Sequence, residues 1–110
     1  MNDSQNKRIE ILKSYLKKDP DDTFSNYALA LEYMSNNDDR SVVEILEGIL
    51  QRDDQYLAAY YQLGKAYEKI SRTEDAKLIY QKGIRVGLKQ KNQRTVNELK
   101  SASESLGNDE

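Results

Sequence analysis

The chain has 110 residues, of which 37% are hydrophobic and 33% charged, with one proline and a formal net charge of -2. This composition favours a single helical domain with a modest core. The absence of cysteine and histidine excludes disulfides and thiol chemistry, and it removes the commonest metal ligand and the usual neutral-pH proton shuttle. No apolar stretch could span a membrane and the start lacks a signal-peptide core, so we expect a cytoplasmic protein. Because cysteine and histidine are absent, we also expect that it uses no cofactor and is not an enzyme.

Three helices are expected in the first half of the chain, over residues 5–18, 23–35 and 39–51. Asp19-Pro20 ends the first of them, because the residue before a proline is disfavoured in the helical region. The second is apolar on nearly every side and should be buried on most of them. Apolar periodicity assigns the inward positions as Ile9, Leu12 and Leu16 on the first helix and Val42, Val43, Ile45, Leu46, Ile49 and Leu50 on the third.

Three pairs of acidic residues stand at predicted helix starts, namely Asp21/Asp22, Asp38/Asp39 and Asp53/Asp54. A carboxylate at a helix start meets free N–H groups and the positive end of the helix dipole. We therefore expect helix caps here rather than a divalent metal site. Asn36 and Asn37 suit the left-handed turn that ends a helix.

Residues 57–88 carry the clearest motif of the chain. An aromatic-x2-Leu-Gly-x2-Tyr series on one predicted helix is followed by an Ala-x3-aromatic pair on the next, and these residues are Tyr60, Leu63, Gly64, Tyr67, Ala76 and Tyr80. The motif recurs when the sequence is shifted by 34 residues, a shift that also aligns Ile11, Ile45 and Ile79. This spacing and this period resemble the tetratricopeptide repeat family.

The resemblance implies an all-α fold, an antiparallel helix-turn-helix solenoid of about six helices in a single domain over residues 1–110. It divides the chain into a second-helix-like half repeat at 5–18, tetratricopeptide-like repeats at 23–56 and 57–90, and a capping helix at 91–106. Val96, Leu99, Ala102 and Leu106 form one thin apolar line on this last helix, and one wet face suits the end of a solenoid.

The same repeat logic places small residues where the two helices of a unit cross closely. Gly64 is expected to face Ala76 at such a crossing, and a bulky side chain at Gly64 should force the helices apart. The residues expected to fill the wider gaps of the core are Tyr33, Tyr67 and Tyr80.

In proteins of this family, first helices line a concave groove that receives a peptide or helix of a partner protein. Carried over by position, this groove consists of Phe24, Tyr27, Ala28, Leu31, Ser35, Ala58, Tyr61, Gln62, Lys65 and Glu68. Tyr27 and Leu31 occupy slots where chaperone-binding members hold a terminal carboxylate, so that activity is not expected. An apolar, aromatic groove suits a hydrophobic anchor, and we predict a non-catalytic adaptor. The same side chains could equally pack against the terminal helices or a second copy.

Charge is distributed unevenly along the chain. Residues 21–54 hold nine acids and two bases, whereas residues 72–100 hold eight bases and three acids. Because the two halves carry opposite charge, copies of the chain could associate with one another. A self-associating structural unit, that is a homo-oligomer, is therefore the alternative to an adaptor. Lys82, Arg85 and Lys89 lie on one side of a predicted helix and could bind phosphates or an acidic partner. The aromatics that stack bases are missing from this segment, so we expect a solvated face and no nucleic-acid partner.

Overall fold

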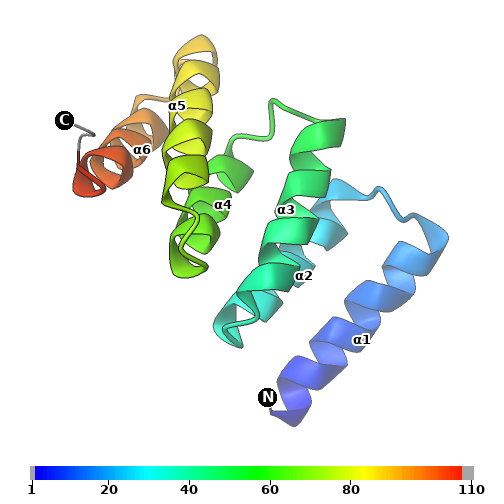
Figure 1. The fold of residues 1–110 in the computed structure, drawn as a ribbon. Coiled ribbons are helices and arrows are strands. Elements are labelled where there is room, and N and C mark those ends of the chain that lie inside the picture. Colours follow the sequence, from blue (N-terminus) through cyan, green and yellow to red (C-terminus); the bar gives the residue numbers. More distant parts are fainter. Residues whose placement is uncertain (1, 108–110) are drawn as a thin grey trace.

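The protein folds into six helices joined by short turns, and the computed structural model describes residues 2–107. The helices are α1 (Asp3–Lys18), α2 (Thr23–Ser35), α3 (Asp39–Arg52), α4 (Ala58–Lys69), α5 (Thr73–Lys89) and α6 (Gln93–Ser105). They stack along a molecule that measures 45 × 27 × 21 Å (Figure 1). The all-α solenoid that the sequence predicts is confirmed over these residues. None of the helices described there is long and apolar enough to cross a membrane.

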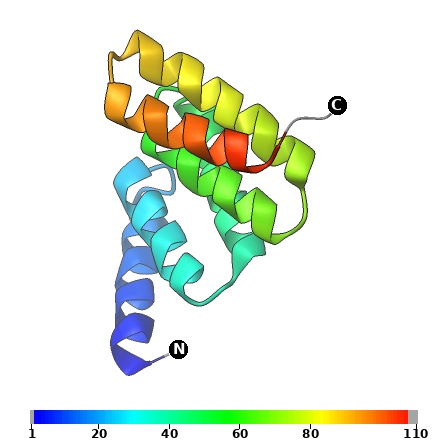
Figure 2. The same cartoon turned by 90° about the vertical axis from the view of Figure 1, so that its left-hand side faces the viewer.

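Each helix packs against the next one in the chain, and successive helices run in opposite directions (Figure 2). Consequently α3 lies between α2 and α4, and α5 lies between α4 and α6. In contrast, α1 packs mainly against α2 and has no helix before it within the described residues. One side of α1 is therefore uncovered.

Local capping hydrogen bonds set the helix ends, and some of these ends differ from those that the apolar periodicity predicts. Helix α1 begins at Asp3, two residues before the predicted start, because the Asn2 side chain accepts a hydrogen bond of 2.7 Å from the backbone N–H of Gln5. Helix α6 begins at Gln93 rather than at residue 91, because Lys91 has a positive φ of 58° and Asn92 caps the helix. Asn37 has a φ of 59°, as the predicted left-handed turn requires.

Two of the three acidic pairs cap helices as predicted. Asp22 accepts from the backbone N–H of Ser25 at 2.9 Å, and Asp38 caps α3 in the same way. The prediction was wrong for the third pair, because the cap position of α4 is Leu57, which makes no side-chain cap bond. Asp53 instead ends α3 and accepts from the backbone N–H of Gln55.

The core is densest between α4 and α5, where Tyr80 is fully buried. A Cβ added at Gly64 would lie only 2.1 Å from Cε1 of Tyr80. The glycine therefore makes room for the tyrosine ring, which lies nearer to it than the predicted neighbour Ala76. Tyr67 is also in the core, as predicted, whereas Tyr33 is only partly buried.

Helix α2 is less buried than its apolar sequence suggested. Its buried residues are Ser25, Leu29 and Ala30, but Phe24 is 76% exposed and Leu31 is 39% exposed. The helix is covered on its other sides, as expected, but α1 and α3 do not cover the side that carries these two residues. An apolar strip is thus left on the surface.

Candidate functional site

Helices α2, α4 and α6 contribute to one side of the stack, which we call the first-helix face. Side chains join α2 to the start of α4, since the rings of Tyr27 and Tyr56 meet edge to face with centroids 5.4 Å apart. Burial raises the pKa of the Tyr27 phenol, and the side chain of Gln62 on α4 opposes that shift. These contacts hold the two helices in a fixed relation.

The ten residues of the predicted groove come from α2 and α4, but they differ in how accessible they are. Those that are largely exposed are Phe24, Leu31, Ser35 and Ala58. Those that are half-buried are Tyr27, Ala28, Tyr61, Gln62, Lys65 and Glu68. The exposed apolar anchors of the predicted set are therefore Phe24 and Leu31, both on α2.

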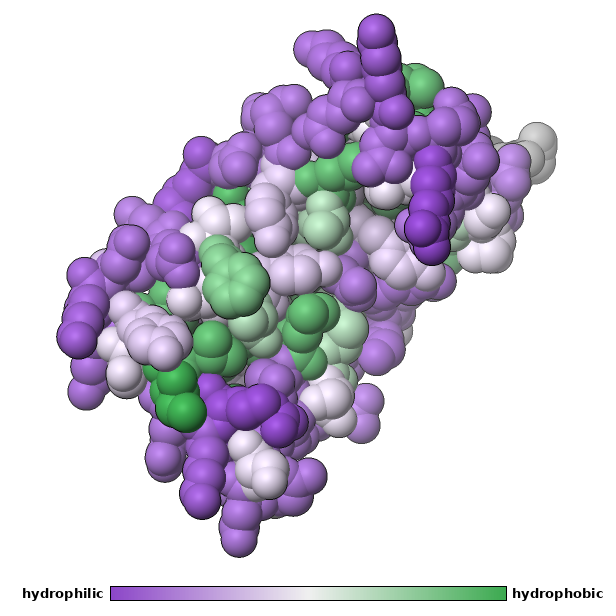
Figure 3. Space-filling model, turned by 180° about the vertical axis from the view of Figure 1, so that it is seen from behind, coloured by the Kyte–Doolittle hydropathy of each residue, from purple (hydrophilic) through white to green (hydrophobic). Residues whose placement is uncertain are grey.

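Figure 3 views the molecule from behind and shows hydrophobic side chains gathered in one area, ringed by hydrophilic ones. Exposed large hydrophobic side chains on α1 and α2 are Ile11, Tyr15, Phe24 and Leu31. Ile11 and Tyr15 were not among the predicted site residues, because the predicted groove was taken from first helices and their own helix is second-helix-like. The repeat did contain a signal for these two residues. The 34-residue shift aligns them with Ile45 and Ile49 of α3, whose side chains pack in or against the core.

The polar members of the predicted groove are bound to internal partners. The ammonium of Lys65 lies 3.8 Å from a carboxylate oxygen of Glu68 and 5.5 Å from the centroid of the Tyr61 ring. Glu68 in turn accepts a hydrogen bond from the hydroxyl of Tyr80. This hydrogen bond adds to burial in raising the pKa of Tyr80. Glu68 therefore joins α4 to α5 through Tyr80, whereas Lys65 is paired within α4.

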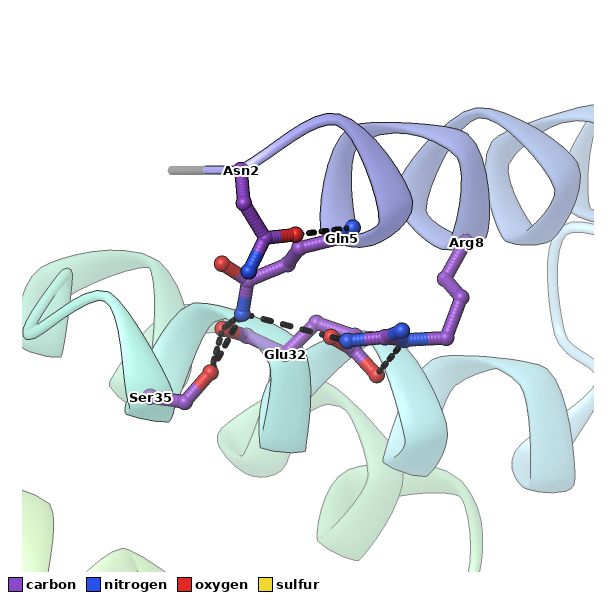
Figure 4. Close-up of polar contacts among 5 residues, drawn as sticks. All are labelled: Asn2, Gln5, Arg8, Glu32 and Ser35. Atoms are coloured by element: carbon purple, nitrogen blue, oxygen red, sulfur yellow. Dashed lines mark hydrogen bonds and ion pairs between the residues drawn. The ribbon is translucent and has the colours of Figure 1, made fainter.

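A polar cluster fixes the N-terminal end of α1 against α2 (Figure 4). The buried side-chain amide of Gln5 donates to the backbone carbonyl of Glu32 at 3.2 Å and to the hydroxyl of Ser35. Arg8 donates twice to the carboxylate of Glu32, at 3.0 and 3.2 Å, and this interaction holds the pKa of Glu32 below its usual value. Ser35 is thus used to attach α1.

A pocket of about 420 Å³ lies between α4 and α6, beside Tyr61 and Lys65. Its other lining residues, all on α6, are Asn97, Glu98, Ser101, Ala102 and Ser105. The repeat pattern predicted only an end cap for α6, so these residues were not among the predicted site residues. The first-helix face therefore has an apolar end on α2 and a polar end on α6, and the neighbouring helix α1 carries further exposed apolar side chains.

Such a surface can remove apolar groups of a partner from water. The sequence contains no cysteine or histidine. Within residues 2–107 no group of three acidic side chains is arranged to hold a metal ion. The main feature of the site is an exposed apolar area bordered by polar side chains. Such areas are typical of interaction surfaces.

The fold is similar to solved structures of tetratricopeptide repeat proteins. A crystal structure of a tetratricopeptide repeat domain protein from Salinibacter ruber has a TM-score of 0.75 and 34% identity over 81% of this chain and 99% of that one. An NMR structure of such a protein from the same organism gives 0.76 and 35% over 84% and 93%. A crystal structure of MamA gives 0.68 and 21% over 93% and 66%, a likeness of fold. No known family profile and no curated protein matches the chain in sequence.

Proposed function

This chain belongs to the tetratricopeptide repeat family, and we propose that it is a non-catalytic adaptor that binds a segment of a partner protein on its first-helix face. The observation that carries the proposal is the uncovered apolar strip of Phe24 and Leu31. Both side chains belong to the groove that the repeat pattern assigns. A partner's apolar side chain would remove them from water, which is the main favourable term in most protein association.

The size of the strip supports binding rather than chance exposure. Together with Ile11 and Tyr15, the exposed parts of Phe24 and Leu31 amount to on the order of 400 Å² of largely apolar surface. Patches of this size on a monomer are often functional. The aromatic ring of Phe24 is the best candidate for a binding hot spot, because buried aromatic anchors often dominate binding energy.

The chemistry of the face also indicates the kind of segment that fits. An apolar or aromatic side chain would pack on Phe24 and Leu31, while polar groups further along would meet the α4–α6 pocket. Since Lys65 is already paired with Glu68, it contributes less to charge recognition than its position in the groove suggested. We infer a segment with a hydrophobic anchor at one end and a polar stretch at the other.

A capture experiment tests this proposal. Immobilised protein with Phe24→Ala or Leu31→Ser should lose partners that the unmodified protein retains from a lysate of its own cells. Leu78→Ser is the matched control, since Leu78 is 64% exposed on α5 and lies outside the face. Because all three side chains are exposed, helix content should be unchanged in every variant. Equal capture by the Phe24 variant and the unmodified protein would refute the assignment.

The open side of α1 favours a second candidate function, self-association. Ile11 and Tyr15 are 52% and 55% exposed, although the residues that align with them in α3 pack inward. A second copy would cover them and could use the same strip on α2. Light scattering at several concentrations tests this candidate: a dimer that persists at high salt and is lost in Ile11→Glu supports it, and a monomer throughout eliminates it.

A further inference from the structure

A second groove, of about 630 Å³, lies between α3 and α5 on the side of the molecule turned to the viewer in Figure 1. Both helices pack against α4, whose side chains form part of its floor. The apolar lining from α3 and α5 includes Leu50, Ile79 and Val86. This groove shares no lining residue with the ten predicted groove residues or with the α4–α6 pocket.

One wall of the groove is a row of cations on α5. Lys82, Arg85 and Lys89 recur every three or four residues, so they project from one side of the helix, and all three are exposed. Within residues 2–107 none of the three takes part in an ion pair of 4 Å or less. They span about two helical turns, or roughly 10 Å along the axis.

The acidic groups on the opposite side are already bonded. Glu47 accepts a hydrogen bond of 2.5 Å from the hydroxyl of Tyr67 and lies 4.0 Å from the guanidinium of Arg72. Asp54 accepts from the side-chain amide of Gln55 at 2.9 Å. The lining therefore carries three cations along α5 against two carboxylates, Glu47 and Asp54, and its charge is positive in sum.

A ligand for this groove must combine carboxylates with apolar side chains. A nucleic-acid backbone is disfavoured, because it has no aliphatic group for the apolar lining. A helix suits the groove better, since acidic residues at positions i, i+3 and i+7 match the spacing of Lys82, Arg85 and Lys89. Its neighbouring apolar stripe would then face the lining.

We propose that the α3–α5 groove is a second interaction site, which binds an acidic amphipathic helix of a partner protein. Carboxylates of that helix pair with Lys82, Arg85 and Lys89, and its apolar stripe packs on Leu50 and Val86. The site is independent of the proposed function of the first-helix face, because none of its lining residues is among the ten predicted groove residues and its chemistry is charge pairing.

The probe is a fluorescent 16-residue synthetic helix with leucines along one stripe and glutamates at i, i+3 and i+7 beside it. A matched peptide carries lysine in place of each glutamate. Fluorescence anisotropy at low salt should show saturable binding of the glutamate peptide to the unmodified protein, weakened by added salt. Amide NMR signals of α3 and α5 should shift on binding, whereas those of α2 should not.

The triple variant Lys82→Glu, Arg85→Glu, Lys89→Glu should bind the glutamate peptide roughly tenfold more weakly and should prefer the lysine peptide. The control triple variant Lys91→Glu, Arg94→Glu, Lys100→Glu makes the same change in net charge outside the groove and should keep most of the affinity. Equal losses in both variants would assign the effect to net charge and overturn the proposal. So would shifts confined to α2, or no saturable binding up to about 1 mM peptide.

Discussion

Replacing Gly64 by alanine adds a methyl group where the ring of Tyr80 lies. The new Cβ would stand 2.1, 2.5 and 2.6 Å from three ring carbons, whereas ordinary contacts begin at 3.4 Å. The ring cannot easily move aside, because Tyr80 is fully buried and its hydroxyl is bonded to Glu68. Helices α4 and α5 would have to separate by about 1 Å, and overpacking of this kind costs about 1 to 3 kcal/mol in the free energy of unfolding.

Urea unfolding followed by far-ultraviolet circular dichroism measures this loss directly. We expect a lower midpoint at an unchanged slope, and a melting temperature lower by several degrees. Gly48→Ala is the matched control in a helix of the same kind, because its Cβ would meet only the flexible end of Arg52, at 3.3 Å. Alanine is the better helix former by up to about 1 kcal/mol, so this variant should be as stable as the unmodified protein or more stable.

A double-mutant cycle shows whether the ring is the cause. Tyr80→Leu removes the ring, so adding Gly64→Ala to that variant should cost much less than it does alone. Full stability of the single variant Gly64→Ala, or an equal loss in the presence and absence of the Tyr80 ring, would refute the packing argument.

Three further predictions concern single polar groups. Asp22→Ala should lower the free energy of unfolding by about 1 kcal/mol through loss of an N-cap, whereas Asp54→Ala should change it little, as chemical denaturation will show. The hydrogen bond from Arg8 lowers the pKa of Glu32, so its contribution is present at neutral pH and is lost as pH falls through that lowered pKa. Acid denaturation curves should therefore be shallower for Glu32→Gln. Burial raises the pKa of Tyr80, so stability should fall above about pH 10 as the unfolded chain alone loses that proton, and absorbance at 295 nm should show this phenol titrating only on unfolding.

Most of the fold could be predicted from the sequence, because repeat spacing and helix signals agree along the chain. The clearest case is the unit around Gly64 and Tyr80, where the small residue and the aromatic that lies on it are both visible in the motif. Helix ends were less predictable, since they depend on single hydrogen bonds. The side chain of Asn2 extends α1 by two residues, and Lys91 delays α6 by adopting a positive φ.

The exposed surface could be predicted only in part, because the exposure of a side chain depends on whether a neighbouring helix covers it. The sequence of α2 looks buried on most sides, yet Phe24 stays in water because no neighbouring helix covers it. Ile11 and Tyr15 are exposed for the same reason on α1. Side-chain contacts between helices were also hidden from sequence, as in the hydrogen bond that Tyr80 on α5 donates to Glu68 on α4.

The most direct test of the proposed adaptor is photo-crosslinking from the first-helix face in living cells. A benzophenone amino acid would replace Phe24 in one variant and Leu78 on α5 in another. The account predicts a discrete crosslinked partner from position 24 that is absent from position 78. Identical products from both positions, or a product from position 78 alone, would contradict it.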